Sequence, residues 1–103
     1  MPIFETQDQG EVLVIQLLAT HLEAANAAEF KQELSRTQLP SSGNVLVDCA
    51  KLEFIDSSGL GALLHLNNSL SKEVRPLALK NLRPEVLSVV ELLRLNTVFK
   101  LES

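Results

Sequence analysis

The chain has 103 residues, 46 % of them hydrophobic, and a formal net charge of −4. This length suits one domain spanning residues 1–103, and the hydrophobic fraction is enough for one core. The nine Lys and Arg residues are scattered and outnumbered by thirteen Asp and Glu residues, which argues against a nucleic-acid partner.

Strands and helices are expected to alternate along the chain. Residues 3–18 predict an antiparallel hairpin that turns at Asp8–Gly10. In chain order, the remaining expected elements are a helix within residues 23–37, a buried strand and its extension over 44–55, a helix over 57–72, a strand over 75–82, a helix over 83–96 and a closing strand over 97–102. The order β-β-α-β-α-β-α-β predicts an α/β fold, with a mostly parallel mixed sheet that opens with an antiparallel hairpin and is covered by helices.

Residue types that form metal, redox or membrane sites are sparse. The single cysteine, Cys49, lies in the apolar run VLVDCA and is expected to be a buried hydrophobic residue. His21 and His65 lack metal-ligand spacing, so neither a metal nor another cofactor is expected. No apolar run approaches the ~20 residues of a membrane span, and residues 1–10 do not resemble a signal peptide. The expected location is the cytoplasm, with no membrane partner.

The segment FIDSSGLGALLHL places two serines at the start of a predicted helix. Asp56 precedes that helix, and its carboxylate is expected to accept a hydrogen bond from the first turn as an N-cap. Ser57 and Ser58 fall inside the turn, while Gly59 and Gly61 carry no side chains that would shield the hydroxyls. A helix start favours negative charge through its unpaired N–H groups and its dipole.

Helical geometry, at about 100° per residue, predicts which serine faces solvent. The apolar stripe of this helix consists of Leu60, Leu63, Leu64, Leu66 and Leu70. Its centre lies almost opposite Ser58, so the Ser58 hydroxyl is expected to point outward. The same outward face is expected to carry Ala62, His65 and Ser69. Ser57 lies near the edge of the stripe and is expected to pack against the sheet.

Spacing alone leaves four interpretations of the exposed hydroxyl open. A hydrolytic nucleophile would sit in a Gly-x-Ser-x-Gly turn, but the first glycine is missing and the only candidate bases are His21 and His65. A phosphate-binding loop would need more glycine and a lysine. A phosphorylation site fits the helix start, because the fold tolerates negative charge there while a docking partner would be repelled. The same residues also describe an ordinary N-cap.

The longer segment VLVDCAKLEFIDSSGLGALLHL resembles the signature of STAS domains, most closely that of bacterial anti-sigma factor antagonists. The run from Asp56 to Gly61 matches the family's Asp-Ser-Ser/Thr-Gly-Leu-Gly motif completely. The segments HLEAANAAEFKQEL and LKNLRPEVLSVVELLRLNTVFKL also resemble family segments, so the similarity extends over the whole chain. Two positions depart from the family pattern: Glu23 replaces a usual Asp, and Thr20 stands near a usual Gly.

The resemblance implies a partner-switching mechanism. The unphosphorylated protein would bind an anti-sigma factor that is also a serine kinase of the histidine-kinase-like ATPase type, and a sigma factor would be released. The kinase would phosphorylate the second serine of the motif, Ser58, the complex would dissociate, and a serine phosphatase would restore binding. The protein would be a monomer and not an enzyme. The motif and partner-binding residues implied are Asp56, Ser57, Gly59, Leu60, Gly61 and Glu23.

Two related functions remain as alternatives. The family also contains STAS subunits of lipid or anion transport complexes, which dock on an ATPase or permease. Other partner-switching modules control non-sigma targets such as secretion, motility or second-messenger enzymes. The complete Asp-Ser-Ser-Gly-Leu-Gly motif favours phosphorylation-dependent switching over the transport role. The segment 65–69 is a further candidate for the partner surface, with a solvated helix face as the alternative.

Overall fold

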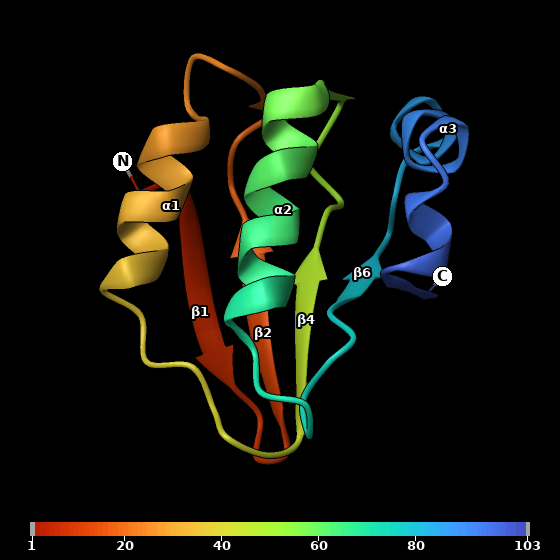
Figure 1. Cartoon of the computed structure of the whole chain (residues 1–103). Helices are drawn as coiled ribbons and strands as arrows, with labels where there is room; N and C mark the ends of the chain where they lie inside the picture. The colour runs from red at the N-terminus through yellow and green to blue at the C-terminus, as the bar shows by residue number, and fades with distance from the viewer. Residues whose placement is uncertain (1, 103) are drawn as a thin grey trace.

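The computed structural model describes residues 2–102 and has a mixed α/β architecture. In chain order its elements are β1 (Phe4–Asp8), β2 (Val12–Leu17), β3 (His21–Leu22), α1 (Ala27–Ser35), β4 (Asn44–Asp48), β5 (Phe54–Ile55), α2 (Ser57–Ser69), β6 (Ala78–Lys80), α3 (Pro84–Leu92), the 3-10 helix η1 (Leu95–Thr97) and β7 (Lys100–Glu102). The main sheet has the order β1-β2-β4-β6-β7, with β1 antiparallel to β2 and the other neighbours parallel. Figure 1 shows α1 and α2 side by side in front of this sheet, with α3 beyond β6. The predicted fold class is confirmed.

A tight turn joins β1 to β2, as predicted. Gly10 has φ +80°, in the left-handed region that glycine adopts without a steric penalty. The Gly10 N–H donates to Asp8 Oδ1 at 3.0 Å, and the Gln9 N–H donates to the Val12 carbonyl at 2.8 Å. These two bonds close the hairpin and set the register in which Phe4 lies opposite Leu17.

The hydrophobic core lies between the helices and the sheet. Phe30 of α1 is fully buried, and its ring packs edge-on against Phe4 of β1 with 5.3 Å between ring centroids. The largest fully buried aliphatic side chains are Ile15, Leu17, Leu22, Leu52, Leu60, Leu63, Leu66, Leu77, Leu79, Val45 and Val47. Burying one such side chain contributes about 1.5–3 kcal/mol, so α2, which supplies three of these leucines, is fixed firmly to the sheet.

The predicted strand and extension over residues 44–55 is two separate strands. β4 ends at Asp48, whose Oδ1 accepts from the Ala50 N–H at 3.0 Å, and the Leu52 N–H donates to the Cys49 carbonyl at 3.0 Å. This turn carries the chain out of the main sheet, and β5 then pairs in parallel with β3 in a second, two-stranded sheet. Pairs of this length are below the four to eight residues that a strand pattern needs.

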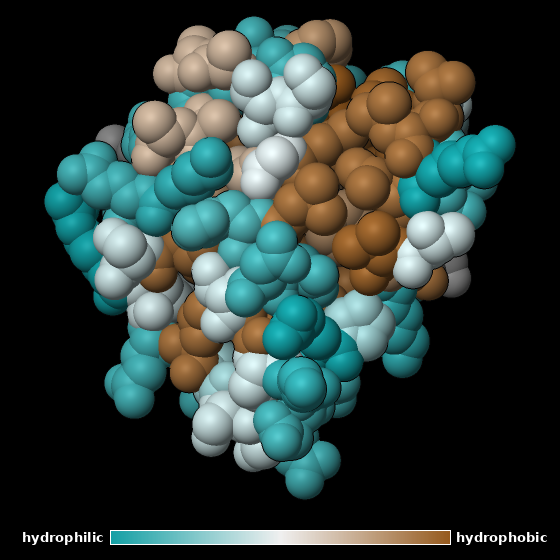
Figure 2. Space-filling view, in the orientation of Figure 1, coloured by the Kyte–Doolittle hydropathy of each residue, from teal (hydrophilic) through white to brown (hydrophobic). Residues whose placement is uncertain are grey.

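The helices are shorter than their predicted segments. α3 ends at Leu92, since Arg94 has a left-handed backbone with φ +59° and begins the 3-10 turn η1. On the predicted apolar face of α3, Val86 and Val90 are buried, but Leu93 is 48 % exposed. Figure 2 shows hydrophobic residues gathered on the side of the molecule where α3 lies.

Cys49 is fully buried at the end of β4, as predicted. Burial, with a smaller contribution from the Asp48 carboxylate, raises the pKa of the thiol to about 12. The thiolate is the reactive form of cysteine, so Cys49 is chemically inert while the chain is folded.

We expect a pH dependence of stability above pH 9 that comes from Cys49. The unfolded thiol loses its proton near its ordinary pKa, whereas the folded thiol keeps it up to about pH 12. The unfolded state therefore binds fewer protons in this interval, and the free energy of unfolding should fall by up to about 1.4 kcal/mol per pH unit. Urea denaturation between pH 8 and about pH 10.5, compared with Cys49→Ala, isolates this contribution. An equal decline in both proteins would contradict it.

Candidate functional site

Asp56 caps α2 and links it to a distant segment of the chain. Its Oδ1 accepts from the Gly59 N–H at 2.9 Å, which confirms the predicted N-cap. Its Oδ2 accepts from the Ala24 N–H at 3.3 Å, and its own N–H donates to the Leu22 carbonyl at 3.3 Å. One residue thereby satisfies a free donor of the helix start and holds the segment before α1 against it.

Gly59 lies where α2 packs directly against the backbone of β3. A Cβ atom at this position would overlap the Leu22 carbonyl oxygen and come within 2.8 Å of Ile55 Cγ1. The glycine is therefore required for the helix to sit on β3. Gly61, two residues later, has open space where a Cβ atom would lie. Packing therefore requires glycine at Gly59 but not at Gly61.

Ser58 is exposed, as predicted, but the prediction for Ser57 is wrong because Ser57 is exposed as well. Ala62, which was expected to face solvent, is completely buried. Viewed around the helix axis, the buried arc of α2 is bounded by Ala62 on one side and by Leu60 on the other. The centre of this arc is rotated by about 40° from the centre of the leucine stripe. The cause is α1, which packs along one side of α2 while the sheet covers another (Figure 1).

The exposure of both serines changes what selects the phosphoacceptor. Helical rotation alone does not separate Ser57 from Ser58, so the assignment of Ser58 rests on its position in the motif. Neither side-chain oxygen forms a hydrogen bond among residues 2–102. Both hydroxyls are therefore accessible at the start of α2, as a modifying enzyme would require.

Glu23 lies in the turn that meets the start of α2. Its N–H donates to Asn26 Oδ1 at 2.9 Å, and Asn26 Nδ2 donates to the His21 carbonyl at 2.8 Å. Asn26 thus orders the segment between β3 and α1, and α1 begins at Ala27 instead of earlier in the predicted segment. Glu23 is half-buried, and the next residue, Ala24, bonds to Asp56. The predicted proximity of this segment to the motif is thus observed, whereas a binding role of Glu23 stays a prediction.

An aromatic pair that the sequence reasoning missed borders the site. His21 of β3 lies opposite Phe54 of β5, with 5.6 Å between ring centroids and a tilt of 39°. Phe54 is 46 % exposed although it is hydrophobic. The available signal was its alternation with buried Ile55 in the two residues before Asp56.

Neither histidine forms a hydrogen bond with Ser57 or Ser58 among the described residues. His65 lies seven residues after Ser58, about 10 Å farther along the helix axis. The Nδ1 atom of His21 is 2.9 Å from Thr20 Oγ1 and is engaged there. Within residues 2–102, no group of three or more His, Cys, Asp and Glu side chains is placed to hold a metal ion.

The segment 65–69 has only part of the exposed face expected of it. Leu66 and Asn67 are buried, and Asn67 Oδ1 accepts from the Leu77 N–H at 2.9 Å. Asn67 thus fixes the end of α2 to the segment before β6. His65, Asn68 and Ser69 remain exposed.

Among the described residues, no helix is both long and apolar enough to span a membrane.

The chain is similar in sequence and in fold to several known proteins. A candidate anti-sigma factor antagonist of Bordetella bronchiseptica, BtrV, is 28 % identical over 94 residues, which cover 91 % of this chain and 81 % of BtrV. The solved structure of an anti-sigma-factor antagonist (STAS) domain protein from Planctomyces limnophilus superimposes with a TM-score of 0.85 at 20 % identity, over 100 % of this chain and 91 % of that one.

The Bacillus anti-sigma factor antagonist SpoIIAA has the same fold in two solved forms. Its unphosphorylated form gives a TM-score of 0.74 at 20 % identity, over 97 % of this chain and 88 % of that one. Its phosphorylated form gives 0.65 at 20 % identity, over 97 % and 91 %.

The family profile described as "Mlab, STAS domain" matches residues 4–102, which include every strand and helix of the fold. This match agrees with the hexapeptide that begins at Asp56, with the capped helix that follows it, and with the superimposed folds. The chain therefore belongs to the STAS domain family.

Proposed function

We propose that this chain is an anti-sigma factor antagonist whose binding is controlled by phosphorylation of Ser58. The partner is an anti-sigma factor with serine kinase activity of the histidine-kinase-like ATPase type. The observation that carries the proposal is the exposed hydroxyl in the first turn of α2, which no hydrogen bond among the described residues engages. The complete motif and the antagonist relatives support it.

The reaction is a phosphoryl transfer for which the partner supplies the catalytic groups. The Ser58 oxygen attacks the γ-phosphorus of ATP, the bond to the β–γ bridging oxygen breaks, and ADP leaves. The serine proton passes to a base of the kinase. This chain acts as the substrate and needs no cofactor of its own, so we infer that it is a binding protein and not an enzyme.

The charge of the phosphate explains how binding is controlled. A phosphoserine adds about −1.5 to −2 charges, and the chain already carries a net charge of −4. Asp56 already occupies the N–H groups of Gly59 and Ala24, so those donors are not free to pair with a phosphate. A phosphate on an exposed serine is hydrated, and a partner that covers it must remove that water and accept the charge. The fold is unaffected, because a helix start tolerates negative charge.

Dephosphorylation by a serine phosphatase completes the cycle and restores binding. Glu23 and the exposed residues of the motif form the docking surface, and the chain acts as a monomer. The transport-complex subunit and the module for a non-sigma target remain the competing functions. They differ in the partner: a permease or transport ATPase in the first case, and a kinase that controls another target in the second.

Phosphate incorporation tests this function. We expect that one serine kinase of this type from the same organism, incubated with the chain and ATP, adds a single phosphate at Ser58. Mass spectrometry of the digested protein locates the phosphate, and Ser58→Ala serves as the control that abolishes incorporation. Incorporation at Ser57 alone, or none with any such kinase, would refute the proposal. Stable capture of a membrane transport complex instead would favour the transport function.

A further inference from the structure

β1 is an edge strand with unpaired backbone groups. It is the first strand of the main sheet and pairs only with β2. The Leu18 N–H donates to the Ile3 carbonyl, and the Gln9 N–H donates to the Val12 carbonyl. The backbone N–H and C=O groups of the odd-numbered residues of β1 therefore point toward β2. Hydrogen bonds alternate along an antiparallel strand, so the N–H and C=O groups of Thr6 and Asp8 point outward. These outward groups have no hydrogen-bond partner among residues 2–102.

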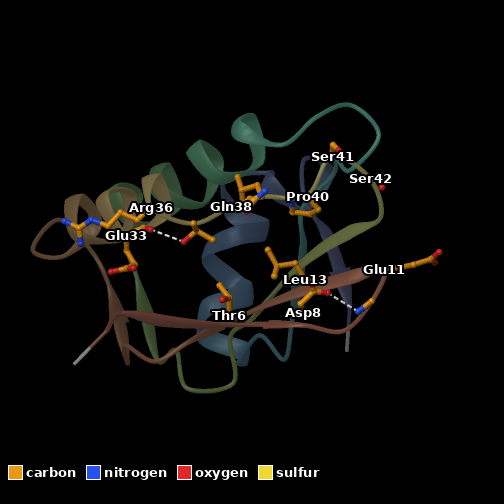
Figure 3. A pocket seen from close by; sticks show the side chains of 13 residues that line it. Thr6, Asp8, Glu11, Leu13, Glu33, Arg36, Gln38, Pro40, Ser41 and Ser42 are labelled. Carbon is orange, nitrogen blue, oxygen red and sulfur yellow. Dashed lines mark hydrogen bonds between the residues drawn. The ribbon is translucent and has the colours of Figure 1, made fainter.

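A groove of about 1010 Å³ adjoins this edge. Its floor is formed by β1 and β2, with the Thr6 and Asp8 side chains on the face where Phe4 is buried under α1. α1 ends at Ser35 and leaves this end of the sheet uncovered, and the loop 37–42 forms the opposite wall (Figure 3). The groove and the free edge therefore share the same two residues, Thr6 and Asp8.

The groove has an acidic lining. Asp8, Glu11 and Glu33 contribute carboxylates, against the single guanidinium of Arg36. Thr6, Thr37, Ser41 and Ser42 add hydroxyls. Hydrophilic residues also predominate at this lower end of the molecule in Figure 2. A ligand of complementary charge is cationic.

We propose that β1 and this groove bind an extended segment of a partner protein that carries Lys or Arg at alternate positions. The segment pairs with the outward N–H and C=O groups of Thr6 and Asp8 as an added strand. Alternate side chains of a strand point to the same face, so its basic side chains reach the groove together. A second copy of this chain fits less well, because its own β1, FETQD, is acidic.

This site lies away from Ser58. The groove is at the end of the sheet where β2 and β4 begin, whereas α2 begins beyond the other end of those strands (Figure 1). Binding at β1 therefore goes beyond the phosphorylation-controlled function and is independent of it.

The test uses the peptide Lys-Thr-Lys-Thr-Lys-Thr-Lys as a probe in an NMR titration of the full chain at 100 mM salt. The largest amide shifts are expected at Thr6 and Asp8. The variant Thr6→Pro removes one outward N–H, which edge strands tolerate, and should weaken binding about tenfold. Thr6→Val keeps that N–H and should bind within about twofold of the native chain.

Charge reversal supplies a matched pair of variants. Glu33→Lys, in the groove, should weaken binding about fivefold, whereas Glu29→Lys, one turn earlier on α1 and outside the groove, should change it less than twofold. A probe N-methylated at alternate amides should not bind the native chain, which tests strand pairing without any variant. Ser58→Asp should bind the probe normally, so failure here is distinct from failure of the proposed function.

Three results would overturn this inference. They are an absence of shifts at β1 with millimolar probe, equal binding of the N-methylated probe, and self-association of the chain through β1.

Discussion

Replacing Ser58 with Asp is expected to weaken binding of the kinase partner at least a hundredfold, roughly 2.7 kcal/mol. The substitution places a fixed negative charge at the start of α2, where the partner must exclude water. Like charges brought together in an interface cost several kcal/mol, whereas an exposed acidic residue at a helix start costs the fold almost nothing. Isothermal calorimetry measures the affinity, and thermal denaturation should show an unchanged melting temperature.

Two exposed serines of the same helix provide controls for this prediction. Ser58→Ala should bind like the native chain, because it adds no charge. Ser69→Asp, at the far end of α2, should bind within about threefold, since it adds the same charge away from the site. Ser57→Asp is the critical comparison, because Ser57 is also exposed. A loss of affinity that is larger for Ser57→Asp than for Ser58→Asp would show that Ser57, and not Ser58, controls binding.

Gly59→Ala is expected to lower the free energy of unfolding by about 3 kcal/mol. The new Cβ would overlap the backbone carbonyl of Leu22, which is fixed in β3 and cannot rotate away like a flexible side chain. α2 would have to move, and with it the cap formed by Asp56. Urea denaturation followed by circular dichroism measures the change.

Gly61→Ala is the matched control in the same helix. Its Cβ meets open space, and alanine is favoured over glycine inside a helix by up to ~1 kcal/mol, so stability should rise slightly. Equal destabilisation by the two substitutions would show that contact with Leu22 is not the reason for the glycine at position 59.

Local chemistry made the start of α2 predictable from sequence. An Asp before a Ser-Ser-Gly turn can satisfy the free N–H groups of a helix wherever that helix packs, so Asp56 was identified as the cap without tertiary information. The hairpin at Gly10 was predictable for the same reason, because its conformation depends on neighbouring residues.

Tertiary packing determined what the sequence could not reveal. The orientation of Ser57 was wrong because the helical projection assumed one buried face, whereas α1 and the sheet bury α2 on two sides. The pairing of β3 with β5 involves two residues on each strand, too few for a periodic signal. The groove beside β1 depends on how the end of α1 and the loop 37–42 lie over β1 and β2, which the packed fold determines and a local sequence pattern does not.

The hydrogen bond from the Ala24 N–H to the Asp56 carboxylate joins parts of the chain that are thirty-two residues apart. A short synthetic peptide containing only the serine motif lacks the second part, together with Leu22 and the turn that holds Glu23. An enzyme that recognises both parts would therefore modify the native protein and ignore nascent or denatured chains. Signalling through this serine would then report on folded molecules only.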